Sequence, residues 1–312
     1  MRIAVTGASG FAGGYLAAYL QRAGYDVITY GRRAASALRH PLPAYASWDI
    51  TRGPICAPAV DAVVHCAAMV GDSGARAEFL AANVEGTRAV MATFRRVPRF
   101  IHISTASVYD LSRPLHGVRE DAPCGGHWFS PYAHSKLESE RQLLADGRPV
   151  TILRPHIIYG PGDSTLMPRV LAARRAGWLP LAGTGRNRLS VTHIENLAHA
   201  VCRALDGPVA SGVFNVADAG EVTLDELARV LLRRHAVADR VVYIPGRIAW
   251  QLAAAGEFSA RVLHRSRPPF LTRFVVRQLT QDFTLDLSRA RALLGYAPRW
   301  TVHDGPLGES TS

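Results

Sequence analysis

The chain has 312 residues, of which 48% are apolar and 20% charged, enough for one large domain or two fused domains with a core. Its net charge is +11, but the arginines are scattered along the chain, which argues against a nucleic-acid-binding protein. Four cysteines without C-x-x-C spacing, and no apolar run of about 18 residues, disfavour a disulfide framework, a metal site and a membrane-spanning helix, and favour a cytoplasmic protein.

Strand-like and helical patterns alternate through the first half of the chain. Short β-rich runs predict strands at residues 2–6, 26–30, 45–48, 61–66, 99–104 and 150–153. Helical spacing of apolar residues predicts helices at residues 11–21, 75–94 and 132–145. Strands that alternate with helices pair in parallel through right-handed crossovers. The sequence therefore predicts an α/β fold with a doubly wound parallel sheet, a Rossmann fold.

The pattern is less regular in the second half of the chain. Thr192 with Glu195 and Thr223 with Glu226 form two capping boxes, and each predicts the start of a helix. A last helix is predicted over residues 286–294. These pieces predict a smaller lobe that is packed onto the sheet.

The same patterns divide the chain into two parts. Residues 1–155 form the predicted Rossmann dinucleotide-binding domain, and residues 156–312 form mainly a smaller C-terminal α/β substrate-binding lobe. A strand-like run at 213–216 indicates that the chain crosses back to the sheet around 189–216. Arginines interleave with apolar residues at 261–277, which suits an anionic membrane surface or a solvated helix face. We favour the solvated face and expect at most peripheral membrane contact.

The segment TGASGFAG, residues 6–13, follows the first predicted strand and opens the first predicted helix. Gly7 permits a tight turn, Gly10 lets a pyrophosphate approach the helix N-terminus, and Gly13 lets the helix pack closely on the strand. Three glycines alone are weak evidence, but their place at the start of a βαβ unit is typical of a dinucleotide-binding loop. That place disfavours the alternative, a glycine-rich turn without a ligand.

The end of the second predicted strand indicates which nicotinamide cofactor is bound. Sites that prefer NAD place a carboxylate there for the ribose 2′-hydroxyl, but here Arg32 and Arg33 follow the strand. A planar, bidentate guanidinium suits a 2′-phosphate, so we favour NADP(H), with NAD(H) as the alternative. Asp49 and Ile50, after the third strand, are placed to meet the adenine, although Asp49 equally suits an ordinary loop.

Tyr132 and Lys136, the only lysine in the chain, lie four residues apart on one predicted helix and therefore share a face. An unperturbed tyrosine has a pKa near 10, too high for efficient proton transfer at neutral pH. A nearby ammonium favours the phenolate, and lowering the pKa by about three units needs roughly 4 kcal/mol. We therefore predict that Lys136, together with the positive charge of the oxidised nicotinamide, lowers the pKa of Tyr132. The upstream glycine loop disfavours the alternative, a chance lysine on a solvated helix.

A hydroxyl group is expected to orient the reacting carbonyl at the carboxyl edge of the sheet. The fifth predicted strand runs into ISTASVY, residues 103–109, where Ser104, Thr105 and Ser107 all offer hydroxyl groups. The residue pattern by itself leaves these three candidates open.

Six segments together resemble a known family over nearly the whole chain. They are TGASGFAG at 6–13, HCAA at 65–68, NVEGT at 83–87, HISTASVY at 102–109, YAHSK at 132–136 and LRPHIIYGPGD at 153–163. On these segments the chain resembles an extended short-chain dehydrogenase/reductase of the NAD-dependent epimerase/dehydratase superfamily. The later segments are most similar to the 3β-hydroxysteroid dehydrogenase branch and its bacterial ketoreductase relatives, which act on lipophilic alcohols or ketones.

The resemblance implies catalytic and cofactor-binding roles for individual residues. It maps the catalytic hydroxyl onto Thr105, with Ser104 and Ser107 as alternatives. It assigns proton transfer to Tyr132, and the nicotinamide ribose to Lys136. The implied cofactor-binding residues are Gly7, Ser9, Gly10, Phe11, Ala12, Gly13, Arg32, Arg33, Asp49, Ile50, Ala67, Ala68, Asn83, Tyr132, Lys136 and Pro155.

The resemblance also indicates which residues surround the substrate. The implied substrate residues are Met69, Trp128, Phe129, His156 and Ile158. His156 equally suits a buried structural role, and Asn83 is implied to order the backbone around the site more than to act in the chemistry. Other histidines show no metal-like pairing and are expected to be structural, namely His65, His102, His134, His193 and His199.

We therefore predict an NADP(H)-dependent oxidoreductase that interconverts a secondary alcohol and a ketone on a lipophilic, steroid-like or β-keto substrate. A nucleotide-sugar epimerase or reductase on the same scaffold is the main alternative. A 4,6-dehydratase is disfavoured because Ala106 and Ser107 follow Thr105, where such enzymes carry Asp-Glu. The intact tyrosine and lysine disfavour a redox-sensing binding protein without turnover. Analogy with the superfamily implies a homodimer through the helices at 75–94 and 132–145.

Overall fold

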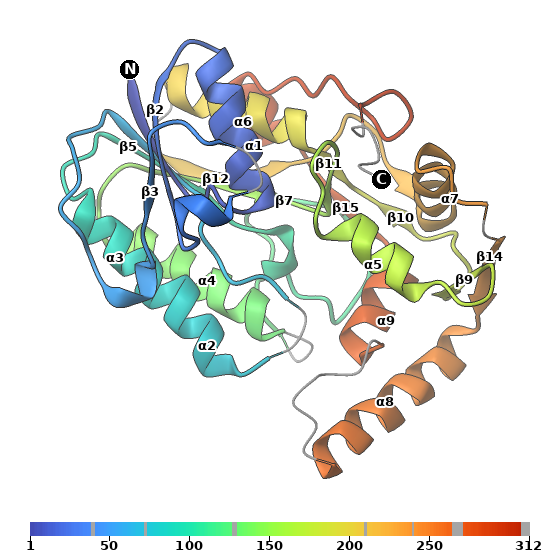
Figure 1. The fold of residues 1–312 in the computed structure, drawn as a ribbon. Coiled ribbons are helices and arrows are strands. Elements are labelled where there is room, and N and C mark those ends of the chain that lie inside the picture. The colour runs from blue at the N-terminus through green and yellow to red at the C-terminus, as the bar shows by residue number, and fades with distance from the viewer. Residues whose placement is uncertain are drawn as a thin grey trace.

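The computed structural model describes residues 1–38, 41–71, 74–126, 130–208, 211–238, 240–263 and 271–306. Its central feature is a seven-stranded parallel sheet with the strand order β12-β7-β5-β4-β1-β2-β3 (Figure 1). The strands are β1 (Arg2–Thr6), β2 (Asp26–Gly31), β3 (Tyr45–Ser47), β4 (Ala62–His65), β5 (Arg99–Ile103), β7 (Val150–Pro155) and β12 (Gly212–Val216). From β1 the chain adds β2 and β3 on one side, and from β4 it adds β5, β7 and β12 on the other side. The predicted doubly wound sheet is therefore confirmed.

Helices cover both faces of this sheet, as the burial of its strands requires (Figure 1). The covering helices are α1 (Phe11–Arg22) and α6 (Ile194–Asp206) on one face, and α3 (Gly86–Thr93) and α4 (Pro131–Ala145) on the other. The side chains of successive residues in a strand point to opposite faces of the sheet. Ile3 and Val5 therefore pack in the core with α1 and α6, whereas Ala4 packs in the core with α3 and α4.

The helix predicted over residues 75–94 contains a π-helical turn. It consists of α2 (Arg76–Leu80), the π segment Ala81–Glu85, and α3. A π turn widens the helix locally and is often found at functional sites. This one carries Asn83, whose side chain is buried and contacts the loop after β4.

The second half of the chain forms smaller sheets and returns to the large sheet through α6 and β12. A four-stranded sheet has the order β13-β10-β15-β6, and β8 with β11 and β9 with β14 form parallel pairs. These strands are β6 (Leu115–Val118), β8 (Ile158–Tyr159), β9 (Trp178–Ala182), β10 (Arg188–Leu189), β11 (Thr192–His193), β13 (Val222–Thr223), β14 (Arg240–Ile244) and β15 (Phe283–Leu285). The other helices of this half are α5 (Leu166–Ala173), α7 (Leu224–Arg234), α8 (Gly246–Val262) and α9 (Arg273–Thr280).

One of the two predicted capping boxes is confirmed and the other is wrong. Thr223 and Glu226 form the reciprocal bonds of a capping box at the start of α7. At α6 the N-cap is His193, whose ring accepts a hydrogen bond from the amide of Glu195. Thr192 instead lies in β11, where its buried hydroxyl is 2.9 Å from the carbonyl oxygen of His156. The hydroxyl that the capping pattern assigned to the helix therefore bonds the backbone of His156 and Val216 instead.

The last predicted helix, residues 286–294, is shorter than expected. Asp286 accepts a hydrogen bond from the amide of Ser288, and the helical turns start at Ser288. They end at Leu294, before Gly295 in the left-handed conformation (φ 64°), where a glycine stop is typical.

Helix α8 extends away from the large sheet (Figure 1) and carries exposed apolar side chains, including Leu252 and Phe258. Part of the basic run at 261–277 lies outside the described residues. Among the helices that the structure describes, none combines the length and the apolar character needed to cross a membrane.

Candidate active site

The glycine loop joins β1 to α1 and is confined by close backbone contacts. Gly7 has a φ of 74°, and a Cβ added there would lie 2.5 Å from the amide nitrogen of Ala67. A Cβ on Gly13 would lie 2.4 Å from the carbonyl oxygen of Gly7. Helix α1 begins at Phe11 after Gly10, which has no side chain to cap it. The first amides of α1 are therefore open to an anion such as a pyrophosphate.

Three segments meet where β2 ends, beside the glycine loop. A Cβ on Gly31 would lie 2.6 Å from Oγ of Ser9 and 2.9 Å from the hydroxyl oxygen of Tyr45. Tyr45 donates a hydrogen bond to the carbonyl oxygen of Arg33 at 2.6 Å. Arg32 and Arg33 are exposed at this corner. Sequence reasoning missed Tyr45, because a tyrosine in an edge strand belongs to no motif.

Asp49 and Ile50 follow β3 and make structural contacts. Oδ1 of Asp49 accepts hydrogen bonds from the hydroxyl (2.8 Å) and the amide (3.1 Å) of Thr51, and the hydroxyl bond is the main cause of the lowered pKa of Asp49. Ile50 packs against α3, where a Cβ on Gly86 would lie 2.5 Å from Cδ1 of Ile50. These contacts fit the loop interpretation of Asp49, and an adenine contact stays a prediction.

Asn83 ties the loop after β4 to α4. Its Oδ1 accepts a hydrogen bond from the amide of Met69 (2.7 Å), and its Nδ2 donates to the carbonyl oxygen of Met69 (3.0 Å). Nδ2 also donates to Oγ of Ser135 at 2.7 Å. The side chain is buried, so these contacts fit the ordering role that the resemblance implied.

Thr105 and Tyr132 come together near the carboxyl end of β5. Thr105 follows the strand, and its Oγ1 accepts a hydrogen bond from the amide of Ser107 at 3.1 Å. Burial raises the pKa of Tyr132, in the first turn of α4, to about 12, while a hydrogen bond with Thr105 acts in the opposite direction. The Ser104 hydroxyl is buried and donates to Glu140 instead. Thr105 is therefore the better placed of these two hydroxyls.

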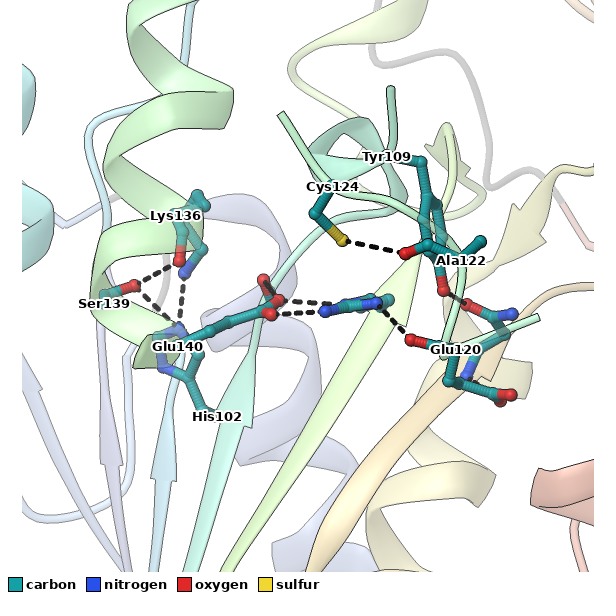
Figure 2. A network of polar contacts seen from close by, with 11 residues as sticks. His102, Tyr109, Glu120, Ala122, Cys124, Lys136, Ser139 and Glu140 are labelled. Atoms are coloured by element: carbon teal, nitrogen blue, oxygen red, sulfur yellow. Dashed lines mark hydrogen bonds and ion pairs between the residues drawn. The ribbon is translucent and has the colours of Figure 1, made fainter. Parts of the chain in front are cut away.

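Lys136 lies one turn beyond Tyr132 on α4, and its ammonium contacts β5. Nζ donates to the carbonyl oxygen of Ile103 at 2.7 Å. Nζ also lies 3.0 Å from Nε2 of His102 (Figure 2). Burial lowers the pKa of Lys136 to about 8, while Glu140 acts to raise it. The pKa of Tyr132 is raised in this structure, so the ammonium of Lys136 alone does not lower it. The reason is that the phenol is buried and that β5 supplies the acceptors for the ammonium.

Comparison with known proteins identifies the family to which this fold and site belong. The model of the NAD dependent epimerase/dehydratase family matches residues 3–217. The chain belongs to this family. It is an NAD(P)-dependent enzyme of the extended short-chain dehydrogenase/reductase superfamily, which confirms the predicted resemblance.

Two relatives and one solved structure illustrate the family. The chain is 31% identical to a 2-alkyl-3-oxoalkanoate reductase of Stenotrophomonas maltophilia, over 98% of this chain and 97% of that protein. It is 28% identical to a 3 beta-hydroxysteroid dehydrogenase/Delta 5-->4-isomerase of Mycobacterium tuberculosis, over 96% of this chain and 87% of that protein. The UDP-glucuronic acid 4-epimerase from Bacillus cereus in complex with NAD matches with a TM-score of 0.72 and 21% identity, over 98% of this chain and 96% of that chain.

The residues of this epimerase/dehydratase family member fit the nicotinamide dinucleotide that the family implies. The glycine loop has no room for side chains at Gly7 and Gly13, and α1 starts without a side-chain cap. Pro155 ends β7 at the same edge of the sheet at which β5 leads to Thr105. When bound, the cofactor supplies or accepts the hydride, which no side chain of the chain can do.

The predicted substrate residues are placed only in part. Trp128 and Phe129 lie outside the described residues. The backbone of Met69 is held by Asn83, and Ile158 lies in the short strand β8. Among the residues that the structure describes, no group of side chains is arranged to hold a metal ion.

His156 is buried and makes structural contacts. Its Nδ1 donates to the carbonyl oxygen of Ser190 at 2.7 Å, and its ring lies 4.0 Å from that of Phe283 between centroids. Burial lowers the pKa of His156 to about 4, so the imidazole is neutral at physiological pH. The sequence allowed His156 either a substrate-lining role or a structural role, and these contacts favour the structural role.

Two histidines that the sequence marked as structural lie beside the ammonium of Lys136. His65 and His102 are neighbours in β4 and β5, with ring centroids 5.1 Å apart. Nδ1 of His65 lies 2.7 Å from Oγ1 of Thr6, and Nε2 lies 2.9 Å from Oγ1 of Thr87. Burial lowers the pKa of His65 to about 3 and that of His102 well below its usual range. Both rings are therefore neutral, and only His102 contacts Lys136.

A buried ion pair continues the polar network behind the site (Figure 2). Glu140, one turn after Lys136, accepts from Nη2 of Arg154 at 2.6 Å and from its Nε at 3.1 Å. The two side chains are 1% and 6% exposed. Arg154 also donates to the carbonyl oxygen of Glu120 and lies over the ring of Tyr109. Sequence reasoning missed Glu140, although its place four residues after Lys136 was a signal.

Proposed function

We propose that this enzyme is an NADP(H)-dependent oxidoreductase that interconverts a secondary alcohol and a ketone on a lipophilic, β-keto or steroid-like substrate. The observation that carries the proposal is the contact between Thr105 and Tyr132 at the carboxyl edge of the sheet. Two hydroxyl groups at one point can both hydrogen-bond a single carbonyl oxygen, which is what the reduction of a ketone requires.

Tyr132 holds the proton that this reaction needs. Its pKa of about 12 keeps the phenol protonated at neutral pH, which suits the direction of ketone reduction. As the hydride reaches the carbonyl carbon, the phenol gives its proton to the carbonyl oxygen and becomes a phenolate. Thr105 donates the second hydrogen bond to that oxygen. Burial dominates the pKa of the resting phenol. In the proposed reaction the positive charge of Lys136, one helical turn away, lowers the cost of forming the phenolate.

A keto substrate is supported by relatives that align along nearly the whole chain. The 2-alkyl-3-oxoalkanoate reductase is 31% identical over 98% of this chain. The UDP-glucuronic acid epimerase shares the fold at a TM-score of 0.72 and 21% identity, and that likeness keeps a nucleotide-sugar epimerase or reductase as the second candidate.

A turnover assay with three substrate classes tests the proposal. The purified protein is mixed with NADPH and either a 2-alkyl-3-oxoalkanoate or a 3-oxosteroid, and separately with NAD⁺ and UDP-glucuronic acid. We expect consumption of NADPH and formation of a secondary alcohol with at least one of the lipophilic ketones. Epimerisation of the UDP-sugar without net reduction of NAD⁺, together with no turnover of either ketone, would contradict the proposal and support the epimerase.

We further propose that Arg32 and Arg33 select NADP(H). Replacing either with alanine is expected to raise the KM for NADPH about tenfold to a hundredfold, since a hydrogen bond to a charged group contributes about 1.5–3 kcal/mol. The KM for NADH is expected to change little, because NADH carries no 2′-phosphate.

The matched control for these substitutions is Arg95→Ala. Arg95 is exposed between α3 and β5, at the amino edge of the sheet, away from the glycine loop. We expect it to leave both KM values unchanged in steady-state kinetics. Equal increases in the KM for NADPH and the KM for NADH in the Arg32 and Arg33 variants would show that these residues do not bind the 2′-phosphate.

A further inference from the structure

The ammonium of Lys136 is anchored by two acceptors of β5, and one of them is a histidine. Nζ lies 2.7 Å from the carbonyl oxygen of Ile103 and 3.0 Å from Nε2 of His102. Lys136 is 1% exposed and His102 is fully buried. An ammonium offers only donors, so Nε2 must accept, and the ring proton of His102 therefore sits on Nδ1.

This tautomer leaves Nδ1 of His102 without a hydrogen-bond partner among the described residues. Ser139 is the other polar neighbour of Nε2, at 3.3 Å, but its hydroxyl donates its proton to the carbonyl oxygen of Lys136 (Figure 2). A buried N–H without a partner costs stability, whereas a hydrogen bond from an ammonium is stronger than a neutral one. The ring of His102 therefore carries its proton on Nδ1, which leaves Nε2 free to accept the hydrogen bond from Lys136.

We propose that His102 is a positioning residue for Lys136, which holds the ammonium against β5, one helical turn from Tyr132, and keeps it protonated. A neutral acceptor favours the charged form of a lysine and so opposes the effect of burial. The consequence for turnover rests on the proposed function, but the anchoring itself does not.

The other groups around the ammonium do not replace this acceptor. The charge of Glu140 on α4 acts to raise the pKa of Lys136, but the hydrogen bonds of this carboxylate go to Arg154 and Ser104. Cys66 follows β4, and burial raises the pKa of its thiol to about 12, so it carries no charge. His65 is neutral and is bonded to two threonines. Within the described part of the chain, the hydrogen-bond partners of Nζ are His102 and Ile103.

The chain itself supplies a direct test, because Lys136 is its only lysine. Protein labelled with ¹³C at lysine Cε gives a single lysine NMR signal, whose titration reports Lys136 without cofactor or substrate. His102→Gln places an amide near the position of Nε2 and keeps an acceptor for Lys136. His102→Asn places an amide near Nδ1 and is too short to reach Lys136.

We expect the titration midpoint of Lys136 to fall by about one to two pH units in His102→Asn and to stay within about half a unit of wild type in His102→Gln. The alkaline limb of the kcat profile for ketone reduction is expected to move to lower pH in the Asn variant alone, because activity is lost as Lys136 loses its proton. If the Asn variant does not fold, His102→Leu replaces it with the same expectation.

The control is His199→Asn. His199 on α6 also has an Nδ1 without a partner among the described residues, but its ring stacks on Tyr296, away from Lys136. We expect no shift of the Lys136 midpoint in this variant. Equal midpoints in wild type and His102→Asn would overturn the proposal. A shifted midpoint in a protein that reduces no ketone would uphold the anchoring and contradict the proposed function instead.

Discussion

Replacing Tyr132 with phenylalanine is expected to lower kcat for ketone reduction by about a hundredfold to ten-thousandfold. The substitution removes only the hydroxyl group, which gives its proton to the carbonyl oxygen in the proposed reaction. The ring remains and keeps its contact with Phe79, whose centroid lies 6.5 Å away. We therefore expect the Kd for NADPH to stay close to that of wild type. Steady-state kinetics and a fluorescence titration of NADPH measure the two quantities.

Tyr25→Phe is the matched control for this change. It also removes one phenolic hydroxyl, which bonds the carboxylate of Asp206 at 2.7 Å and lies outside the site. This variant is expected to retain the wild-type kcat. A Tyr132→Phe enzyme as fast as wild type would show that another group donates the proton. A wild-type protein that binds NADPH but never turns over would favour the redox-sensing alternative.

Replacing Arg154 with methionine is expected to lower the free energy of unfolding by about 3–5 kcal/mol. The substitution leaves the carboxylate of Glu140 buried without the guanidinium that binds it at 2.6 Å and 3.1 Å. A buried charge without a partner costs far more than the pair itself contributes. Because Glu140 also accepts from Ser104, next to Thr105, we expect kcat to fall as well. Urea unfolding followed by circular dichroism measures the change in stability.

Arg141→Met provides the comparison on the same helix. Arg141 pairs with Glu138, and these side chains are 61% and 34% exposed, so its loss is expected to cost less than about 1 kcal/mol. Adding Glu140→Gln to Arg154→Met removes the unpaired charge and is expected to restore part of the lost stability. A loss below about 1 kcal/mol in Arg154→Met alone would show that Glu140 is not held by the pair.

Elements with a strong local pattern could be predicted, and elements that depend on distant partners could not. The segments that became β1 and α1 were found because an apolar run, a glycine loop and helical spacing follow one another directly. The short strands β6 and β15 were missed, since Leu115 pairs with Phe283 across a long stretch of chain. The capping box predicted at Thr192 was wrong for the same reason, because Thr192 lies in β11 and pairs with Ile158 of β8.

Spacing along the chain is enough to predict that Tyr132 and Lys136 share one face of a helix and that a glycine loop precedes them. The contacts of the ammonium, in contrast, depend on how distant segments pack in the folded chain. His102 lies 34 residues before Lys136 and reaches it because β5 pairs in parallel with β4 and β7 beneath α4. Burial of each side chain changes the pKa values of both Tyr132 and Lys136, and spacing along the chain does not determine which side chains are buried.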